Sequence, residues 1–139
     1  MSADNKTLIR RFVDSLNSGA PSSLEEFIAA DYVYHNPAVP EVKDFATLKQ
    51  FNAITSAAFP DLHFTIEDLI AEGDKIVYRY SATGTHKGAL NGIEATGKTV
   101  TITGMVISRV VNGKVQEDWE QTDMLGLMQQ LGVIPKPAA

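Results

Sequence analysis

A chain of 139 residues is long enough to form one domain with its own core, and 44% hydrophobic and 21% charged residues are typical of a globular protein, not a disordered one. The formal net charge of −5 argues against nucleic acid and against an anionic membrane surface as the main partner, because both are bound through basic patches. The lack of cysteine excludes disulfides, thiolate nucleophiles and thiolate metal ligands.

The sequence gives no signal for export or for membrane insertion. Residues 1–11 lack an apolar run with a small-residue cleavage site and begin an amphipathic helix instead. No stretch approaches the roughly 18 consecutive apolar residues that span a bilayer. We therefore expect a cytoplasmic protein without a membrane partner. Neither a repeat nor a linker divides the chain, so we expect a single domain over residues 1–139.

The first part of the chain predicts three helices. Apolar residues recur at three- and four-residue steps over residues 8–16, which predicts an amphipathic helix. A short second helix is expected over residues 22–28, where serines and glutamates are spaced as in a capping box. An extended aromatic segment over residues 31–37 follows. The third helix is expected from about residue 44, its N-cap, to about residue 58.

Beyond Pro60 the pattern changes to the alternation that is typical of strands. We expect four strands, over residues 62–71, 75–85, 98–111 and 114–123. Asn112-Gly113, between the last two, is the most specific turn signal, because both residues tolerate the positive φ of a type I′ hairpin. Residues 84–97 hold four glycines and are expected to form a long loop or flap. A short helix is expected over residues 124–131.

Helices that precede strands predict an α+β fold with a mostly antiparallel sheet. The helices are expected to bury their apolar stripes on one face of the sheet, and a twisted sheet would curl around them. We therefore expect three N-terminal helices and a short C-terminal helix around a curved sheet that encloses an apolar pocket.

The two-residue turn predicts the register of the last hairpin. Counting back from a Val111–Lys114 pair gives three further pairs on one face: Val106 with Trp119, Gly104 with Gln121, and Ile102 with Asp123. We expect this face to be the inner one, because it combines a large aromatic with aliphatic residues. The other face, with Met105, Ile107, Asp118 and Glu120, suits solvent or a subunit interface. A β-bulge would invalidate the count beyond it.

Two residues are candidates for catalysis. In this register Asp123 places a carboxylate at an apolar pocket, where burial raises its pKa and makes it a better proton acceptor near neutral pH. Asp123 is equally well placed to be the N-cap of the last helix, and one residue could do both. His35 could donate a hydrogen bond to a substrate oxygen or shuttle a proton, or it is a structural histidine in a turn.

Other side chains bear on ligand binding. Arg79, in the middle of a strand, could hold a ligand carboxylate or enolate, or it forms a structural ion pair. The three histidines have no metal-ligand spacing, so we expect no metal site. Gly84, Gly88 and Gly92 are not a dinucleotide fingerprint, because no helix is expected to follow them.

Seven short motifs follow one another along the chain between residues 34 and 132. They are Tyr34-His35-Asn36-Pro37, Phe59-Pro60-Asp61-Leu62, Glu72-Gly73-Asp74-Lys75, Gly84-Thr85-His86-Lys87-Gly88, Thr96-Gly97-Lys98, Asn112-Gly113-Lys114, and Glu117-Asp118-Trp119-Glu120-Gln121-Thr122-Asp123 running into Leu125–Gly132. As a set, they resemble the SnoaL-like polyketide cyclase or ester cyclase branch of the NTF2-like superfamily.

The resemblance implies a cone-shaped α+β barrel, commonly a homodimer through the outer sheet face. It implies cofactor-independent ring closure of aromatic polyketide methyl esters by intramolecular aldol condensation, without a metal. Asp123 would be the general acid/base that takes a proton from the carbon between two carbonyls, and His35 would bind or polarise the substrate. The residues expected to contact the substrate are Tyr34, Arg79, Gly104, Val106, Trp119 and Gln121.

Three hypotheses remain open at this point. The first is an enzyme that acts on a small hydrophobic carbonyl compound, a cyclase or a relative of the ketosteroid isomerases and epoxide hydrolases of the same fold. The second is a non-catalytic protein that binds a small hydrophobic molecule. The third is a structural dimer whose functional surface includes Met105 and Ile107. An Asp123 side chain that points into an open pocket would favour catalysis, and one turned to the amides of Leu125 and Gly126 would favour the cap.

Overall fold

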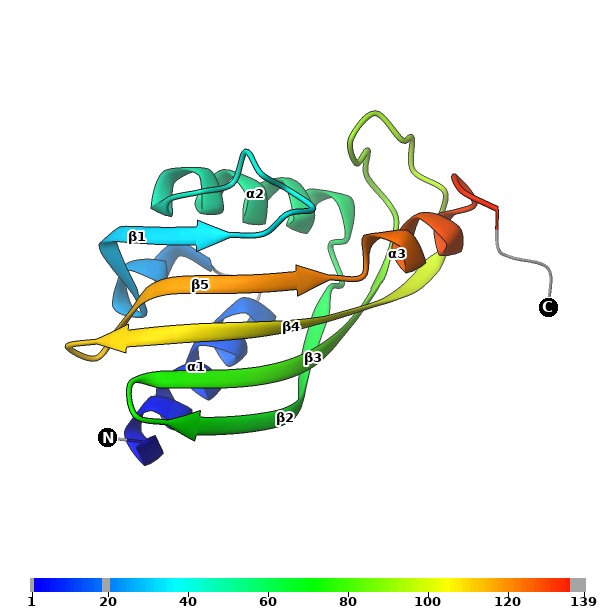
Figure 1. Ribbon diagram of the computed structural model, residues 1–139. Helices are drawn as coiled ribbons and strands as arrows, with labels where there is room; N and C mark the ends of the chain where they lie inside the picture. Colours follow the sequence, from blue (N-terminus) through cyan, green and yellow to red (C-terminus); the bar gives the residue numbers. More distant parts are fainter. Residues whose placement is uncertain (1, 19–20, 136–139) are drawn as a thin grey trace.

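The computed structural model describes residues 2–18 and 21–135 (Figure 1). The elements are, in chain order, α1 (Ser2–Asn17), the 3₁₀ helix η1 (Pro21–Glu26), β1 (Ile28–His35), α2 (Phe45–Ala58), β2 (His63–Glu72), β3 (Lys75–Thr85), β4 (Thr99–Val111), β5 (Lys114–Thr122) and α3 (Met124–Leu131). Among these residues no helix is both long and apolar enough to cross a membrane.

The strands form one curved sheet in the order β1-β5-β4-β3-β2. The β1–β5 pair is parallel and the other pairs are antiparallel. Helix α1 packs along β2 and α2 along β1, so that both cover the same face of the sheet, and α3 continues from the end of β5 (Figure 1). The predicted α+β class, with a curved and mostly antiparallel sheet under helices, is confirmed. The sheet does not close, since β1 and β2 are its two edges.

The second expected helix is shorter than predicted, and the strand after it is longer. Residues 21–26 form a single 3₁₀ segment, and β1 begins at Ile28 instead of near residue 31. Leu24, Phe27 and Ile28 are buried, as expected of the apolar positions in this region. The strand starts early because Ile28 pairs with Val115 of β5, a long-range partner that no local pattern indicates.

The third expected helix has the predicted N-cap. The Asp44 carboxylate accepts a hydrogen bond from the Thr47 backbone N–H at 2.9 Å, and the Thr47 hydroxyl accepts one from the Asp44 N–H at 3.0 Å. This reciprocal pair is a capping box, which satisfies two backbone donors that the helix leaves without a partner.

A β-bulge at Gln116 sets the register of the last hairpin. The turn forms as predicted, with Val111 opposite Lys114. Arg109 then pairs with Glu117 although Val110 pairs with Val115, so Gln116 is an extra residue on β5.

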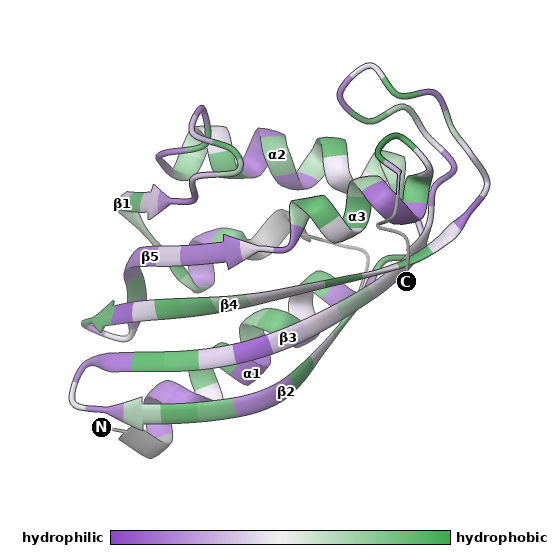
Figure 2. Ribbon diagram, turned by 45° about the vertical axis from the view of Figure 1, so that its right-hand side comes forward, coloured by the Kyte–Doolittle hydropathy of each residue, from purple (hydrophilic) through white to green (hydrophobic). Residues whose placement is uncertain are grey.

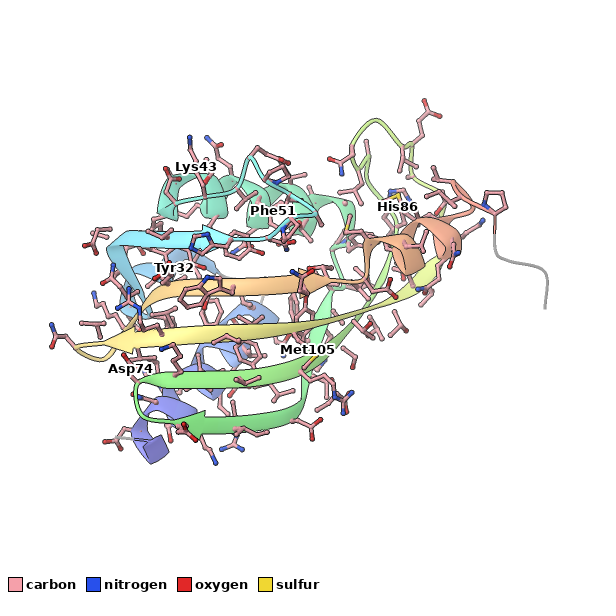
Figure 3. The ribbon with its side chains drawn as sticks, in the orientation of Figure 1. Tyr32, Lys43, Phe51, Asp74, His86 and Met105 are labelled. Atoms are coloured by element: carbon pink, nitrogen blue, oxygen red, sulfur yellow. The ribbon has the colours of Figure 1, made fainter. Side chains whose placement is uncertain are left out.

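Beyond the bulge every side chain of β5 lies on the face opposite to the predicted one, because a shift of one residue reverses the two faces. Val106 lies opposite Glu120, not Trp119, and Trp119 lies opposite Ile107. The predicted inner position of Trp119 and Gln121 is therefore wrong, as is the outer position of Asp118 and Glu120. The prediction for β4 holds, since Val106 is buried and Met105 is exposed on the face away from α1 and α2 (Figure 3).

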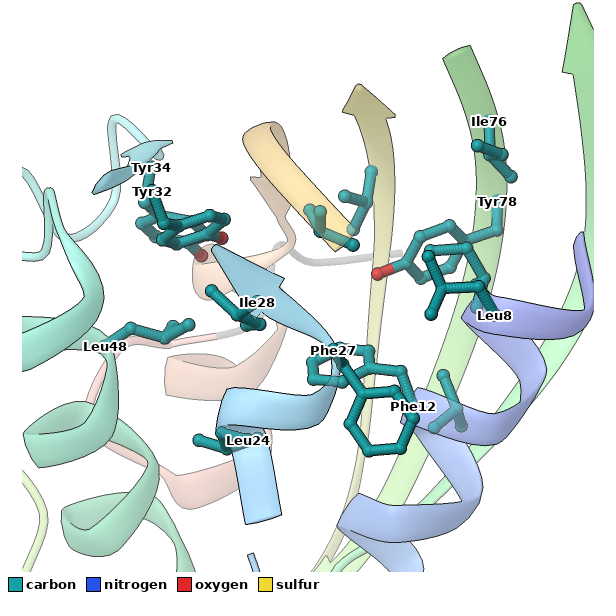
Figure 4. Close-up of a cluster of buried hydrophobic side chains, with 14 of the residues drawn as sticks. Leu8, Phe12, Leu24, Phe27, Ile28, Tyr32, Tyr34, Leu48, Ile76 and Tyr78 are labelled. Carbon is teal, nitrogen blue, oxygen red and sulfur yellow. The ribbon is translucent and has the colours of Figure 1, made fainter. Parts of the chain in front are cut away.

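The core lies between the helices and the inner face of the sheet. The strands alternate between hydrophobic and hydrophilic residues (Figure 2), which is why one face can be buried and the other exposed. Phe12 of α1 packs edge to face against Phe27, and Tyr78 reaches in from β3 (Figure 4). A second cluster, with Phe59 and Leu127, lies at the α3 end of the sheet.

Candidate active site

A cavity of about 160 Å³ lies between the inner face of the sheet and the helices α1 and α2. Most of its wall is apolar, with Phe12 and Leu16 from α1, and Leu48 and Phe51 from α2. The strands and the segment after β1 contribute the polar side chains Tyr32, Tyr34, Asn36, Tyr78, Tyr80, Asp118, Glu120 and Thr122. Asn52 and Thr55 of α2 and Asn91 of the glycine-rich loop add three more. All four tyrosines of the chain therefore line this cavity, around two carboxyl groups.

Glu120 accepts hydrogen bonds from hydroxyl groups on both sides of β5. The Tyr34 hydroxyl of β1 donates to Oε1 at 2.7 Å, and the Tyr80 hydroxyl of β3 donates to Oε2. The Thr122 hydroxyl lies 3.4 Å from Oε2. Tyr80 reaches across β4 because its partner there is Gly104, where a Cβ would lie 2.4 Å from the Tyr80 oxygen.

Asp118 has its own pair of hydroxyl donors. The Tyr32 hydroxyl donates to Oδ2 at 2.5 Å, and the hydroxyl of Ser108, the cross-strand neighbour on β4, donates to Oδ1. Asn36 positions one of the donors to Glu120, since its amide nitrogen donates to the Tyr34 hydroxyl at 3.0 Å. The hydroxyls thus tie β1, β3 and β4 to the two carboxyl groups of β5.

Burial without a countercharge sets the electrostatics of the site. Among residues 2–18 and 21–135, no lysine, arginine or histidine forms an ion pair with Asp118 or Glu120. Burial raises the pKa of Asp118 to about 7, and the negative charge of Glu120 adds to this rise, against the hydrogen bonds from Ser108 and Tyr32. Burial also raises the pKa of Glu120, although the hydroxyls of Tyr80, Tyr34 and Thr122 oppose it.

The tyrosines remain neutral donors. Burial first, and then the adjacent carboxylates, raise the pKa of Tyr34 and of Tyr80 well above the ordinary value. A carboxylate with a raised pKa is a better base near neutral pH. Neutral hydroxyls around it are hydrogen-bond donors for an oxygen that gains negative charge. The site can therefore accept a proton from a carbon acid and stabilise the resulting enolate.

The structure places three of the residues expected at the substrate on the inner side. Tyr34 and Val106 line the cavity, and Gly104 lies beneath the Tyr80 hydroxyl. The other three, Arg79, Trp119 and Gln121, are exposed on the outer face. Arg79 forms an ion pair with Asp68 at 2.7 Å, which is the structural alternative considered for it.

Asp123 is the N-cap of α3. Its exposed carboxylate accepts a hydrogen bond from the Gly126 backbone N–H at 2.9 Å. His35 is exposed on the outer face, where its ring stacks on Trp119 and its Nε2 lies 2.7 Å from Glu117 Oε2. Neither Asp123 nor His35 lines the cavity, so the structure gives no support for the catalytic roles expected of them.

Sequence reasoning missed the two carboxyl groups that the cavity contains. Asp118 and Glu120 alternate along their strand, as do Tyr32 and Tyr34 on β1 and Tyr78 and Tyr80 on β3. Three strands thus repeat the same two-residue spacing of groups that can hydrogen-bond to each other. This shared spacing could have indicated a hydrogen-bonded cluster. The sequence does not show, however, that these faces of the three strands lie next to each other.

The glycine-rich loop contributes to one end of the cavity. Leu90 and Asn91 of this loop line the cavity, and the loop lies beside α3 (Figure 1). His86, labelled in Figure 3, is buried at its base, where its Nδ1 accepts a hydrogen bond from the Thr96 N–H at 3.2 Å. The expected loop is therefore packed at His86 and Leu90 and contributes part of the cavity wall, whereas most of residues 91–99 are exposed.

Comparison with known proteins gives one consistent family. The family model of the SnoaL-like polyketide cyclases matches residues 6–131. The aklanonic acid methyl ester cyclase of Streptomyces peucetius is 28% identical over 130 residues, which cover 90% of this chain and 88% of the relative. The nogalonic acid methyl ester cyclase of Streptomyces nogalater is 28% identical over 124 residues, which cover 86% of this chain and 91% of the relative.

A solved structure agrees with these relatives in fold. AclR of Streptomyces galilaeus, a candidate hydroxylase, superposes with a TM-score of 0.89 at 27% identity, over 99% of this chain and 87% of its own. Fold and family model thus extend over nearly the same residues. The chain belongs to the SnoaL-like polyketide cyclase family.

Proposed function

We propose that this protein closes a ring in a small hydrophobic, polyketide-like carbonyl compound by intramolecular aldol condensation, with Glu120 as the base. One observation supports this proposal above all: a partly buried carboxylate, held by two tyrosine hydroxyls and without a countercharge, lines a largely apolar cavity. Two relatives reported above are named methyl ester cyclases, which supports a ring-closing reaction.

The reaction needs only groups that the cavity wall provides. Glu120 takes a proton from the carbon between two carbonyls, and the electron pair of the broken C–H bond moves into an enolate. Hydroxyl donors stabilise the enolate oxygen. The enolate carbon then attacks a ketone of the same molecule, a C–C bond forms, and the new alkoxide oxygen takes up a proton. The apolar wall holds the substrate in a conformation that keeps the two reacting carbons close, so less conformational entropy is lost in the transition state.

Two alternatives fit the site less well. A protein that only binds an apolar molecule has no use for a buried and a partly buried carboxyl group in its cavity, because removing each from water costs free energy. The candidate hydroxylase AclR shares the fold, but hydroxyl and carboxyl groups on a cavity wall are suited to proton transfer, as ring closure requires.

The test is conversion of the two esters that the relatives' names give, aklanonic acid methyl ester and nogalonic acid methyl ester. Wild-type protein should close the ring, and Glu120→Gln should be slower by about 100-fold or more, because it keeps the shape but loses the base. Glu117→Gln is a matched control, since Glu117 lies on the same strand but on the outer face. Binding without conversion by wild type, or equal rates for wild type and Glu120→Gln, would contradict the proposal.

We also propose that two copies pair through the outer sheet face. A row of neighbouring side chains crosses all five strands there: His35, Trp119, Ile107, Val77 and Ile70. Trp119, Ile107 and Ile70 are exposed by 37%, 39% and 63%. Three exposed apolar side chains in one row of the outer face support an interface between proteins.

A further inference from the structure

We propose that Asp118 is the proton donor of the same site, which protonates the alkoxide oxygen formed at ring closure, while Glu120 only takes the proton from carbon. This inference rests on the proposed ring closure. A single carboxyl group could carry out both proton transfers, first from carbon and then to oxygen. Here the two transfers are assigned to two different carboxyl groups.

The position of Asp118 allows this role. Asp118 and Glu120 are separated by one residue on β5, so both face the cavity and their Cα atoms are about 7 Å apart. The carbon that loses a proton and the oxygen that gains one belong to neighbouring parts of the closing ring. A separation of about 7 Å leaves room for both atoms, each within hydrogen-bond reach of its own carboxyl group.

The contacts determine which group holds the proton before the reaction. Asp118 is buried and Glu120 is partly buried, and the two carboxyl groups share one cavity without a cation. They cannot both ionise cheaply, so the pair retains a proton. Glu120 has three hydroxyl groups close to its oxygens, and Asp118 has two. Hydrogen bonds to a charged carboxylate favour its ionised form. The charge therefore resides on Glu120 and the proton on Asp118, in agreement with the raised pKa of Asp118.

The proton balance closes without any further reactant. At the start Glu120 is ionised and Asp118 is protonated. Ring closure breaks one C–H bond, forms one C–C bond and forms one O–H bond, after which Glu120 is protonated and Asp118 is ionised. The proton passes from Glu120 back to Asp118 before the next turnover. The substrate is isomerised, and nothing is oxidised or reduced.

A purely structural role for Asp118 predicts a different result. Through Tyr32 and Ser108, Asp118 links β1 and β4 to β5. If that link were its only role, its loss would loosen the whole cavity and would slow every step of the reaction alike. A proton donor is needed only after the enolate has formed, so its loss leaves the first step intact.

The experiment measures the two steps separately with aklanonic acid methyl ester in deuterated water. Incorporation of deuterium at the acidic carbon reports proton removal, and formation of the ring reports the whole reaction. Asp118→Asn should retain deuterium incorporation but slow ring closure by about 100-fold or more. Glu120→Gln should lose both reactions, and the outer-face control Glu117→Gln should keep both.

Each other outcome excludes part of the reasoning. Ring closure by Asp118→Asn at the wild-type rate, with Glu120→Gln inactive, overturns the role of Asp118 but leaves the proposed function intact. Equal losses of both reactions in Asp118→Asn show a structural role only. Wild-type protein that neither exchanges nor closes the ester overturns the proposed function, and this inference with it.

A second variant keeps the inference testable if Asp118→Asn does not fold. Tyr32→Phe removes the hydrogen bond that favours the ionised form of Asp118, so the pKa of Asp118 should rise. Ring closure that needs protonated Asp118 declines at alkaline pH, and in Tyr32→Phe this decline should begin at higher pH. An unchanged pH profile in Tyr32→Phe would overturn the role of Asp118.

Discussion

Replacement of Asp118 by Asn should change how the stability of the fold depends on pH. The change removes one titratable group and keeps the size and most of the hydrogen-bonding capacity of the side chain. Asp118 is 6% exposed, and burial raises its pKa from 3.8 to about 7. Between these values the folded protein holds a proton that the unfolded chain has released.

The sign and the size of the effect follow from this difference. Stability decreases with pH wherever the folded state binds more protons than the unfolded state. The loss of wild-type stability that Asp118 causes is absent below about pH 4, increases up to about pH 7, and is complete above it. At about 1.4 kcal/mol for each pH unit, the whole effect amounts to about 4 kcal/mol, a large part of the stability of a small domain.

The assay is urea unfolding, followed by circular dichroism, at steps of about one pH unit between about pH 4 and 8. The free energy of unfolding of Asp118→Asn minus that of wild type should increase steadily over this range. Glu117→Gln is a control of opposite sign, because hydrogen bonds from His35 and Arg109 lower the pKa of Glu117. In that control the stability advantage of the wild type should stay constant over most of the range and be lost only from about pH 4.5 downward, as the pH falls through the lowered pKa of Glu117.

One result would refute the reasoning about the buried pair. If the difference between Asp118→Asn and wild type stayed constant from about pH 4 to 8, the folded and unfolded states would bind the same number of protons at this position. Asp118 would then be ionised in the folded protein, and burial would not control its charge.

Three further predictions concern other parts of the molecule. Gly104→Ala places a methyl group 2.4 Å from the Tyr80 hydroxyl, so it should displace Tyr80 from Glu120, cost about 1–3 kcal/mol in urea unfolding and abolish ring closure; unchanged turnover would show that this contact is dispensable. Asp123→Ala removes the cap of α3 and should cost about 1 kcal/mol while turnover per folded molecule persists; lost turnover at unchanged stability would restore a catalytic role for Asp123. Ile107→Lys should convert a dimer into a 15.1 kDa monomer in sedimentation, and a wild-type mass of 15.1 kDa would exclude the dimer.

Local patterns in the sequence predicted the elements and several of their ends. The capping box at Asp44, the turn at Asn112-Gly113 and the final helix after Asp123 all form as expected. Each of these features depends on contacts within about four residues, for which the sequence holds the whole signal. The alternation along β4 also predicted its inner residues correctly, because a strand on the wall of a core must bury one face.

The candidate site depended on contacts that no local pattern contains. The single extra residue at Gln116 turns Asp118 and Glu120 into the cavity and Trp119 out of it. A bulge is stabilised by the packing of both strands, and the parallel pairing of β1 with β5 brings Tyr32 and Tyr34 to the carboxyl groups. The sequence by itself determined which residues alternate and where the chain turns, since these are local properties. Only the tertiary structure decided which face of β5 is buried, because the register beyond a bulge depends on long-range packing.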